Sequence, residues 1–165
     1  MKVVVVVATA LALTASVAHA AGPAELEPFS FLLGEWPSVG TGKPGESKGT
    51  AVFARGLQDR VILRTSFAEY PGSRHDDLMV IYALPNAGVR ADYHDNEGHV
   101  IRYAVSSPVQ GQAVFVSDQI SGAPRFRLTY KLQSADVLKG EFEIAPPNAP
   151  EAFKPYLNWE SRKAK

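Results

Sequence analysis

Short runs of β-branched and aromatic residues, separated by turn residues, constrain this chain more than any other feature. Pro and Gly cluster at short intervals, as at Pro71-Gly72, Pro85-Asn86-Ala87-Gly88 and Asn96-Glu97-Gly98. The segments between these clusters are rich in Val, Ile, Phe and Tyr, and none shows a sustained helical period. Regular short strands separated by turns are typical of a sandwich or a barrel. The sequence therefore predicts an all-β domain.

We expect an antiparallel meander barrel of about 8–10 strands, because short turns join each predicted strand to the next. Short helical turns are expected near both ends, at 25–33 and at 148–151, where Pro150 suits the first turn of a helix. The predicted strands are 35–42, 49–57, 61–70, 78–84, 89–95, 99–106, 113–119, 125–132, 137–144 and 157–163.

The central hairpin has a register that can be read from its turn. Asp95 favours the first position of a type I turn, and Gly98 suits the left-handed position that follows. Pairing Asp95 with His99 places Tyr93 and Tyr103 on one apolar face. A shift of one residue would mix the polar and apolar faces, so the alternation supports this register.

The first twenty residues have the pattern of a secretory signal. Met1-Lys2 is followed by an apolar run over 3–17 and by small residues at Ala18 and Ala20. The run is too short to span a membrane. We expect residues 1–20 to be removed as a signal peptide, leaving 21–165 as a single domain in the periplasm or secreted. No Cys follows the run, so a lipid-anchored form is excluded.

The composition excludes several classes of function. The chain has 17 basic and 17 acidic side chains, so no surplus of positive charge is available to bind nucleic acid. The absence of cysteine excludes thiolate catalysis and thiolate metal sites, and it means that the core alone must stabilise an exported domain.

The first predicted strand resembles the first strand of the calycin superfamily, which includes the lipocalins. Gly34 and Trp36 give the lipocalin G-x-W motif. The spacing of Gly34, Trp36, Ser38, Gly40 and Gly42 is similar to the nitrobindin-type pattern G-x-W-x-G-x-G-x-G, with Ser38 in place of one glycine. The chain is also similar to a bacterial family of exported proteins of lipocalin-like type, through segments 77–82, 95–101, 124–130 and 153–156.

This resemblance implies an antiparallel barrel with an internal cavity that is open at one end. It gives Trp36 a structural role over the closed end, beneath a cation from the last strand, for which Arg162 is the candidate. Nitrobindin-type proteins bind haem through a histidine near the C-terminal end of the barrel. No His follows His99 in this chain, so the resemblance does not carry haem binding over, and we expect no cofactor.

Asp95 and His99 are the candidates for acid/base catalysis, because a carboxylate that holds an imidazole is a general-base arrangement. Turn chemistry alone also explains Asp95, and no G-x-S-x-G motif supplies a nucleophile. His75 lies before a predicted strand, in a separate turn, and His94 points to the opposite face from His99. No metal-ligand spacing is met, so we expect no metal site.

Apolar binding inside the barrel is the function that we favour. The partner would be a small apolar or amphipathic molecule, with no nucleic acid and no membrane span in the mature protein. The alternatives are a structural or interaction module with a filled interior, acting through its edges or as a homodimer, and an enzyme that uses Asp95 and His99. The expected ligand-binding residues are Tyr93, Tyr103, Tyr130, Phe126, Phe142 and Tyr82, with Gly34, Trp36 and Gly98 as structural residues.

The sequence leaves open which face of the sheet points inward. Asp92 and Arg102, and Arg127 with Glu141 or Glu143, can pair across strands on the polar face. If that face is outward, these are surface pairs; if it is inward, they line a polar cavity.

Overall fold

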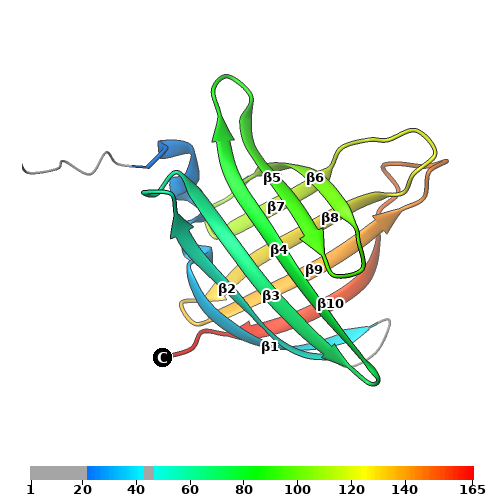
Figure 1. Cartoon of the computed structure of the whole chain (residues 1–165), viewed down its shortest axis with the longest axis horizontal. Coiled ribbons are helices and arrows are strands. Elements are labelled where there is room, and N and C mark those ends of the chain that lie inside the picture. Colours follow the sequence, from blue (N-terminus) through cyan, green and yellow to red (C-terminus); the bar gives the residue numbers. More distant parts are fainter. Residues whose placement is uncertain (1–21, 43–46) are drawn as a thin grey trace, which may run out of the picture.

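A closed antiparallel barrel is the fold of this protein in a computed structural model, which describes residues 22–42 and 47–165. The expected signal peptide lies outside the described residues. Ten strands follow one another around the barrel, and β1 closes the ring by pairing with β10 (Figure 1). The all-β meander barrel predicted from the turn pattern is thus confirmed. No helix in the described part of the chain is long and apolar enough to cross a bilayer.

The observed strands agree with the predicted ones to within a few residues, except at one strand start. β4 begins at Ser73, well before the predicted start at Leu78, so His75 and Asp77 belong to a strand and not to a turn. The elements are η1 (Ala24–Leu32), β1 (Gly34–Gly42), β2 (Ser47–Gly56), β3 (Val61–Tyr70), β4 (Ser73–Leu84), β5 (Gly88–Asp95), β6 (Val100–Ser106), β7 (Gln112–Ser117), β8 (Arg125–Ser134), β9 (Val137–Ala145) and β10 (Lys154–Arg162).

The register of the β5–β6 hairpin is the predicted one. Tyr93 pairs with Ile101, and the backbone N–H of Asp95 donates to the carbonyl of His99. Gly98 has φ +89°, the left-handed conformation that the turn requires. The apolar face that contains Tyr103 points into the barrel, where that side chain is buried.

The polar face is therefore the outer one. Asp92 pairs with Arg102 there, and the Arg127 guanidinium binds the Glu143 carboxylate at 2.7 Å on the outside of β8 and β9. Arg127 also stacks over the Phe153 ring, 4.5 Å from its centroid. Charged side chains on this face stabilise the surface and do not line the interior.

The short 3-10 helix η1 closes one end of the barrel. The helix lies at one end of the ring of strands (Figure 1), and its apolar residues Leu26, Phe29 and Leu32 are buried. The indole Nε1 of Trp36 donates a hydrogen bond of 2.6 Å to the carbonyl of Leu32, which would otherwise be an unpaired group at the end of the helix. Trp36 is fully buried next to this helix, which is where the resemblance to the lipocalins places it.

The cation over Trp36 is Lys163 and not Arg162. The Lys163 ammonium lies 5.3 Å from the centre of the Trp36 ring, whereas Arg162 binds Glu160 on the surface. Gly34 makes this contact possible: its φ is +124°, and a Cβ there would lie 2.7 Å from the Lys163 side chain. The Gly and the Trp of the G-x-W motif are thus linked, because the glycine leaves the space through which the lysine reaches the indole.

The second predicted helical turn does not form a helix. Residues 146–152 make two successive turns, in which Ala149 N–H donates to Pro146 and Ala152 N–H donates to Ala149. Among the described residues η1 is the one helix. The segment around Pro150 has a capping pattern but is too short to form a helix, because β10 begins at Lys154 and Pro155 cannot continue a helix.

The burial of η1 can be tested with Phe29, whose side chain is 2% exposed. We expect Phe29→Ala to lower the free energy of unfolding by about 3–5 kcal/mol, since it leaves a cavity beneath the helix. Urea denaturation followed by fluorescence measures this change. Ile120→Ala, at a side chain that is 66% exposed, is the control and should alter stability by no more than about 0.5 kcal/mol. Equal effects of both substitutions on stability would contradict the packing of η1 against the end of the barrel.

Candidate ligand-binding site

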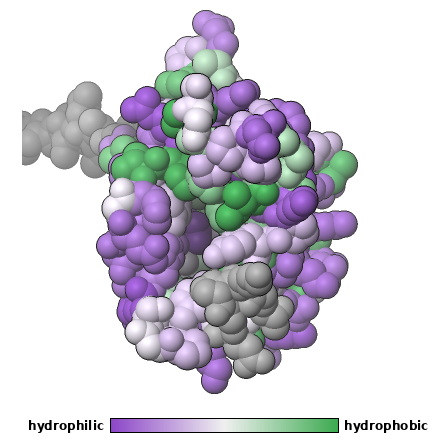
Figure 2. Space-filling view, turned by 90° about the vertical axis from the view of Figure 1, so that its right-hand side faces the viewer, coloured by the Kyte–Doolittle hydropathy of each residue, from purple (hydrophilic) through white to green (hydrophobic). Residues whose placement is uncertain are grey.

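The open end of the barrel leads into a cavity of about 500 Å³. We call this end the mouth; it lies opposite η1 and carries the β3–β4 and β5–β6 turns. Figure 2 views the molecule from this side and shows a hollow near its centre, bordered by hydrophilic residues on the left. The size lies within the range of small-molecule sites in proteins, and side chains therefore do not fill the barrel.

Five of the six aromatic residues predicted for the site line the cavity. They are Tyr93, Tyr103, Tyr130, Phe126 and Phe142. Tyr82 does not: it follows the inward-facing Ile81 on β4, and its hydroxyl donates to the Asp92 carboxylate at 3.1 Å on the outer surface. The prediction for Tyr82 was wrong because it rested on residue type alone, whereas strand alternation places this side chain outside.

One wall of the cavity is apolar and comes from β8, β9 and β10. The rings of Phe126 and Phe142 stack with their centroids 5.7 Å apart and an angle of 15° between their planes. Trp159 on β10 meets Tyr130 edge to face at 5.9 Å. The sequence analysis missed Trp159, although Gly140 in the middle of β9 was a signal: a Cβ there would lie 2.0 Å from the indole.

The facing wall is polar and comes from β3 to β6. At its base Arg64 on β3 contacts Asp77 on β4, with 3.2 Å between Nη1 and Oδ1 and also 3.2 Å between Nη2 and Oδ2. Both side chains are at most 10% exposed. Burial raises the pKa of Asp77, while the Arg64 guanidinium acts in the opposite direction. This pair was not predicted from the sequence, because the predicted strand began only at Leu78, after Asp77.

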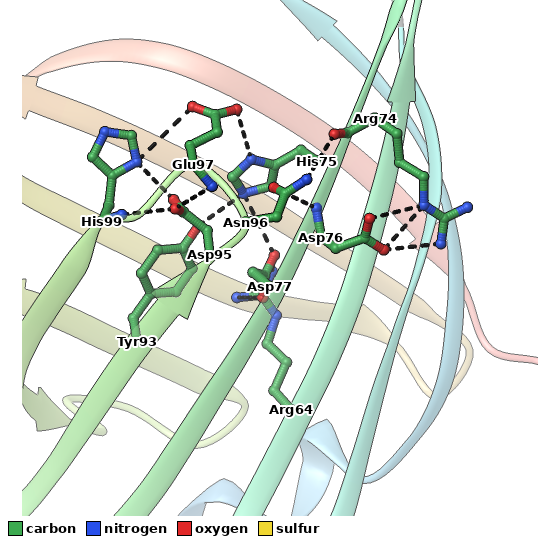
Figure 3. Close-up of polar contacts among 10 residues, drawn as sticks. All are labelled: Arg64, Arg74, His75, Asp76, Asp77, Tyr93, Asp95, Asn96, Glu97 and His99. Carbon is green, nitrogen blue, oxygen red and sulfur yellow. Dashed lines mark hydrogen bonds and ion pairs between the residues drawn. The ribbon is translucent and has the colours of Figure 1, made fainter.

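Above this ion pair a chain of hydrogen bonds crosses the mouth (Figure 3). His75 Nδ1 lies 3.1 Å from Glu97 Oε1, and His75 Nε2 lies 2.8 Å from the Tyr93 hydroxyl. The Tyr93 hydroxyl donates to Asp95 Oδ2 at 3.2 Å, and His99 Nδ1 lies 2.8 Å from the same oxygen. His75 therefore takes part in the site, in contrast to the isolated turn position that the sequence analysis gave it.

The Tyr93 hydroxyl lies between the two histidines of this chain of contacts. Its oxygen lies 2.8 Å from His75 Nε2, and its proton is donated to Asp95, which also holds the His99 ring. Burial raises the pKa of Tyr93, so its hydroxyl keeps this proton.

Asp95 makes both of the contacts expected for it. Its Oδ1 accepts from the backbone N–H groups of Glu97 and His99, which is the turn role, and its Oδ2 holds the His99 imidazole. Burial opposes ionisation, but the hydrogen bonds from His99 and Tyr93 lower the pKa of Asp95 below its usual value. The His99 side chain is 61% exposed, at the edge of the mouth. Catalysis by this pair stays a hypothesis.

The His and carboxylate side chains at the mouth bind one another. Within residues 22–42 and 47–165, no three His, Asp or Glu side chains are arranged so that they could hold a metal ion. His94 faces away from the cavity, as predicted, and pairs with Val100 on the outer side of the hairpin.

No protein-family model and no curated protein matches this chain. Among solved structures it is similar to Rv2717c from M. tuberculosis, with a TM-score of 0.63 at 13% identity over 87% of this chain and 99% of that one. The S-type phycobiliprotein lyase CPES from Guillardia theta has a TM-score of 0.49 at 10% identity, covering 83% and 90% of the two chains. A de novo designed fluorescence-activating β-barrel has a TM-score of 0.46 at 13% identity, covering 82% and 95%.

The likeness to Rv2717c concerns the fold alone. This chain forms a closed antiparallel barrel of ten strands, the architecture that the resemblance of its first strand implied.

The role of Asp95 predicts a dependence of stability on pH. Because its pKa is lowered in the folded protein, its contribution is complete above the ordinary value of about 3.9 and is lost as the pH falls through the lowered value. We expect Asp95→Asn to cost about 1–3 kcal/mol at pH 7 and progressively less below pH 4, measured by denaturant unfolding across that range.

Asp118→Asn provides the control for this experiment. It makes the same change in an ion pair with Arg90 on the outer surface and should cost about 0–1 kcal/mol. A deficit in Asp95→Asn that stays constant into acid would contradict the role of the charged carboxylate.

Proposed function

We propose that this protein binds a small, largely apolar molecule inside its barrel. The observation that carries the proposal is a cavity of about 500 Å³ that opens at the mouth and is lined by aromatic side chains. Burial of apolar surface would supply most of the affinity, at roughly 25 cal/mol for each Å² removed from water. The calycin-like fold is consistent with this function.

The form of the barrel supports a binding role over a purely structural one. A module with a filled interior would carry large side chains throughout, whereas here they fill only the half next to η1, with Trp36, Phe53 and Phe115 among them. Toward the mouth the inward positions include small residues such as Ala51, Ser66 and Ala68, which leave space beside the aromatic wall.

An enzyme is the second candidate, and the contact of 2.8 Å between Asp95 and His99 favours it. In the described structure, the ionised partners of the His99 ring are the carboxylates of Asp95 and Glu97. That arrangement supplies an acid or a base but no nucleophile. It is also explained by the turn, so we place binding first.

We further propose that the protein works outside the cytoplasm after losing residues 1–20. The support is the pattern of a charged start, an apolar run and small residues at Ala18 and Ala20. Mass spectrometry of protein recovered from the periplasm of a bacterial host should give Ala21 as the first residue. Full-length protein retained in the cytoplasm would contradict export and would leave the binding proposal intact.

Binding can be tested with N-phenyl-1-naphthylamine, an uncharged dye whose fluorescence rises in apolar surroundings. Titration of the mature protein should give a saturable rise. Ala68→Trp places an indole in the cavity from an inward position of β3 and should weaken dye binding at least about tenfold, which is about 1.4 kcal/mol.

The matched control is Thr65→Trp, on an exposed outward position of the same strand. It should bind the dye as the unchanged protein does. If Ala68→Trp also binds normally, the dye does not occupy the barrel, and the proposed function is wrong.

A further inference from the structure

The cavity has two chemically different walls, and this division restricts the ligand beyond its size. Strands β8, β9 and β10 contribute aromatic and aliphatic side chains, of which the stacked Phe126 and Phe142 are the centre. Strands β3 to β6 lie across the barrel and contribute Arg64, Asp77, Tyr93 and Asp95. A ligand that fills this space must present an apolar face to one side and hydrogen-bonding groups to the other.

The buried charges on the polar wall are already paired within the protein. Arg64 is neutralised by Asp77, and the Asp95 carboxylate is held by His99, Tyr93 and two backbone N–H groups (Figure 3). An anionic ligand would find Arg64 already paired and the carboxylates of Asp77 and Asp95 nearby, which would repel it. A cationic ligand at the base would face Arg64. Burying an unpaired charge is costly, so this wall disfavours ligands of either sign.

Hydrogen-bonding capacity, in contrast, is left over at the base of the cavity. Arg64, Asp77 and Tyr130 line the cavity, and Arg64 Nε, Asp77 Oδ1 and the Tyr130 hydroxyl are buried atoms with no hydrogen-bond partner among the described residues. The Oδ1 atom has its ionic contact with Nη1, without the geometry of a hydrogen bond. Burial raises the pKa of Tyr130 to about 12, so its hydroxyl keeps its proton at neutral pH. The three groups comprise a donor, an acceptor and one that can do either.

We propose that the cavity selects an uncharged aromatic molecule whose polar edge both donates and accepts hydrogen bonds, and that it discriminates against a carboxylate of the same shape. A carboxamide or a hydroxyl group on a flat ring has this chemistry. The ring would lie on Phe126 and Phe142, and the polar edge would reach Arg64, Asp77 and Tyr130. This inference rests on the proposed function, since it requires that the cavity takes a ligand.

The test is competition between two nearly isosteric molecules, 2-naphthamide and 2-naphthoate, against N-phenyl-1-naphthylamine at pH 7.5. The amide should displace the dye from the unchanged protein at a concentration at least about tenfold lower than the carboxylate, which corresponds to about 1.4 kcal/mol. This ratio needs no variant, so it does not depend on the folding of one. Equal potency, or tighter binding of the carboxylate, would overturn the inference.

A charge substitution sharpens the test. Asp77→Asn leaves Arg64 without its carboxylate, so the variant should bind 2-naphthoate at least about tenfold better than the unchanged protein and lose its preference for the amide. Asp118→Asn, which breaks an outer-surface pair with Arg90, should leave both affinities unchanged. A folded Asp77→Asn variant that keeps the original preference would contradict the role of the ion pair.

The outcomes separate the two proposals. If the dye binds in the barrel but neither 2-naphthamide nor 2-naphthoate displaces it, the proposed selectivity is wrong and the binding function stands. If the dye itself fails to bind, both proposals fall.

Discussion

The closed end of the barrel is the constraint on which the rest of the structure depends. The η1 side chains, Trp36 and the half of the core next to them close this end of the barrel to solvent. The hydrogen bond from Trp36 to Leu32 fixes the helix over the strands, and Lys163, the residue after β10, lies over the indole. Because this half is packed, the other half can remain open without unfolding the barrel.

Strand alternation explains why a charged pair lies inside an otherwise apolar barrel. Arg64 and Asp77 occupy inward positions of adjacent antiparallel strands. They are diagonal neighbours, because Asp77 pairs with Ser66, two residues along β3 from Arg64. Neither side chain could be accommodated there alone, because an unpaired buried charge is far more costly than a paired one. A hydrophobic pair of similar size would serve stability at least as well, so stability alone does not explain the charged groups.

Much of the fold could be predicted from the sequence, and the reason is local. Turn residues and the two-residue period of each strand specify the hairpins, and the register of Tyr93 with Ile101 followed from the Asp95 turn alone. The site was harder to predict because it depends on pairs across strands. His75 and Asp77 precede an obvious apolar run, so the start of β4 was placed too late. The polar wall of the cavity was missed for the same reason, because both residues belong to it. Tyr82 was placed in the cavity because its residue type was given more weight than the two-residue alternation of the strand. The cation over Trp36 is Lys163, one position after the expected Arg162.

The seam between β1 and β10 has a consequence for how the chain reaches this structure. Nine of the ten strand pairs join neighbours in sequence, whereas the seam brings Ser38 to Ser161 and so requires nearly the whole domain to form a loop. Loop-closure entropy makes such a contact slow to form, so the local hairpins should assemble before the ring does. Until the ring closes, β1 and β10 are free sheet edges able to pair with another chain, and only the pairing of β1 with β10 ends this exposure.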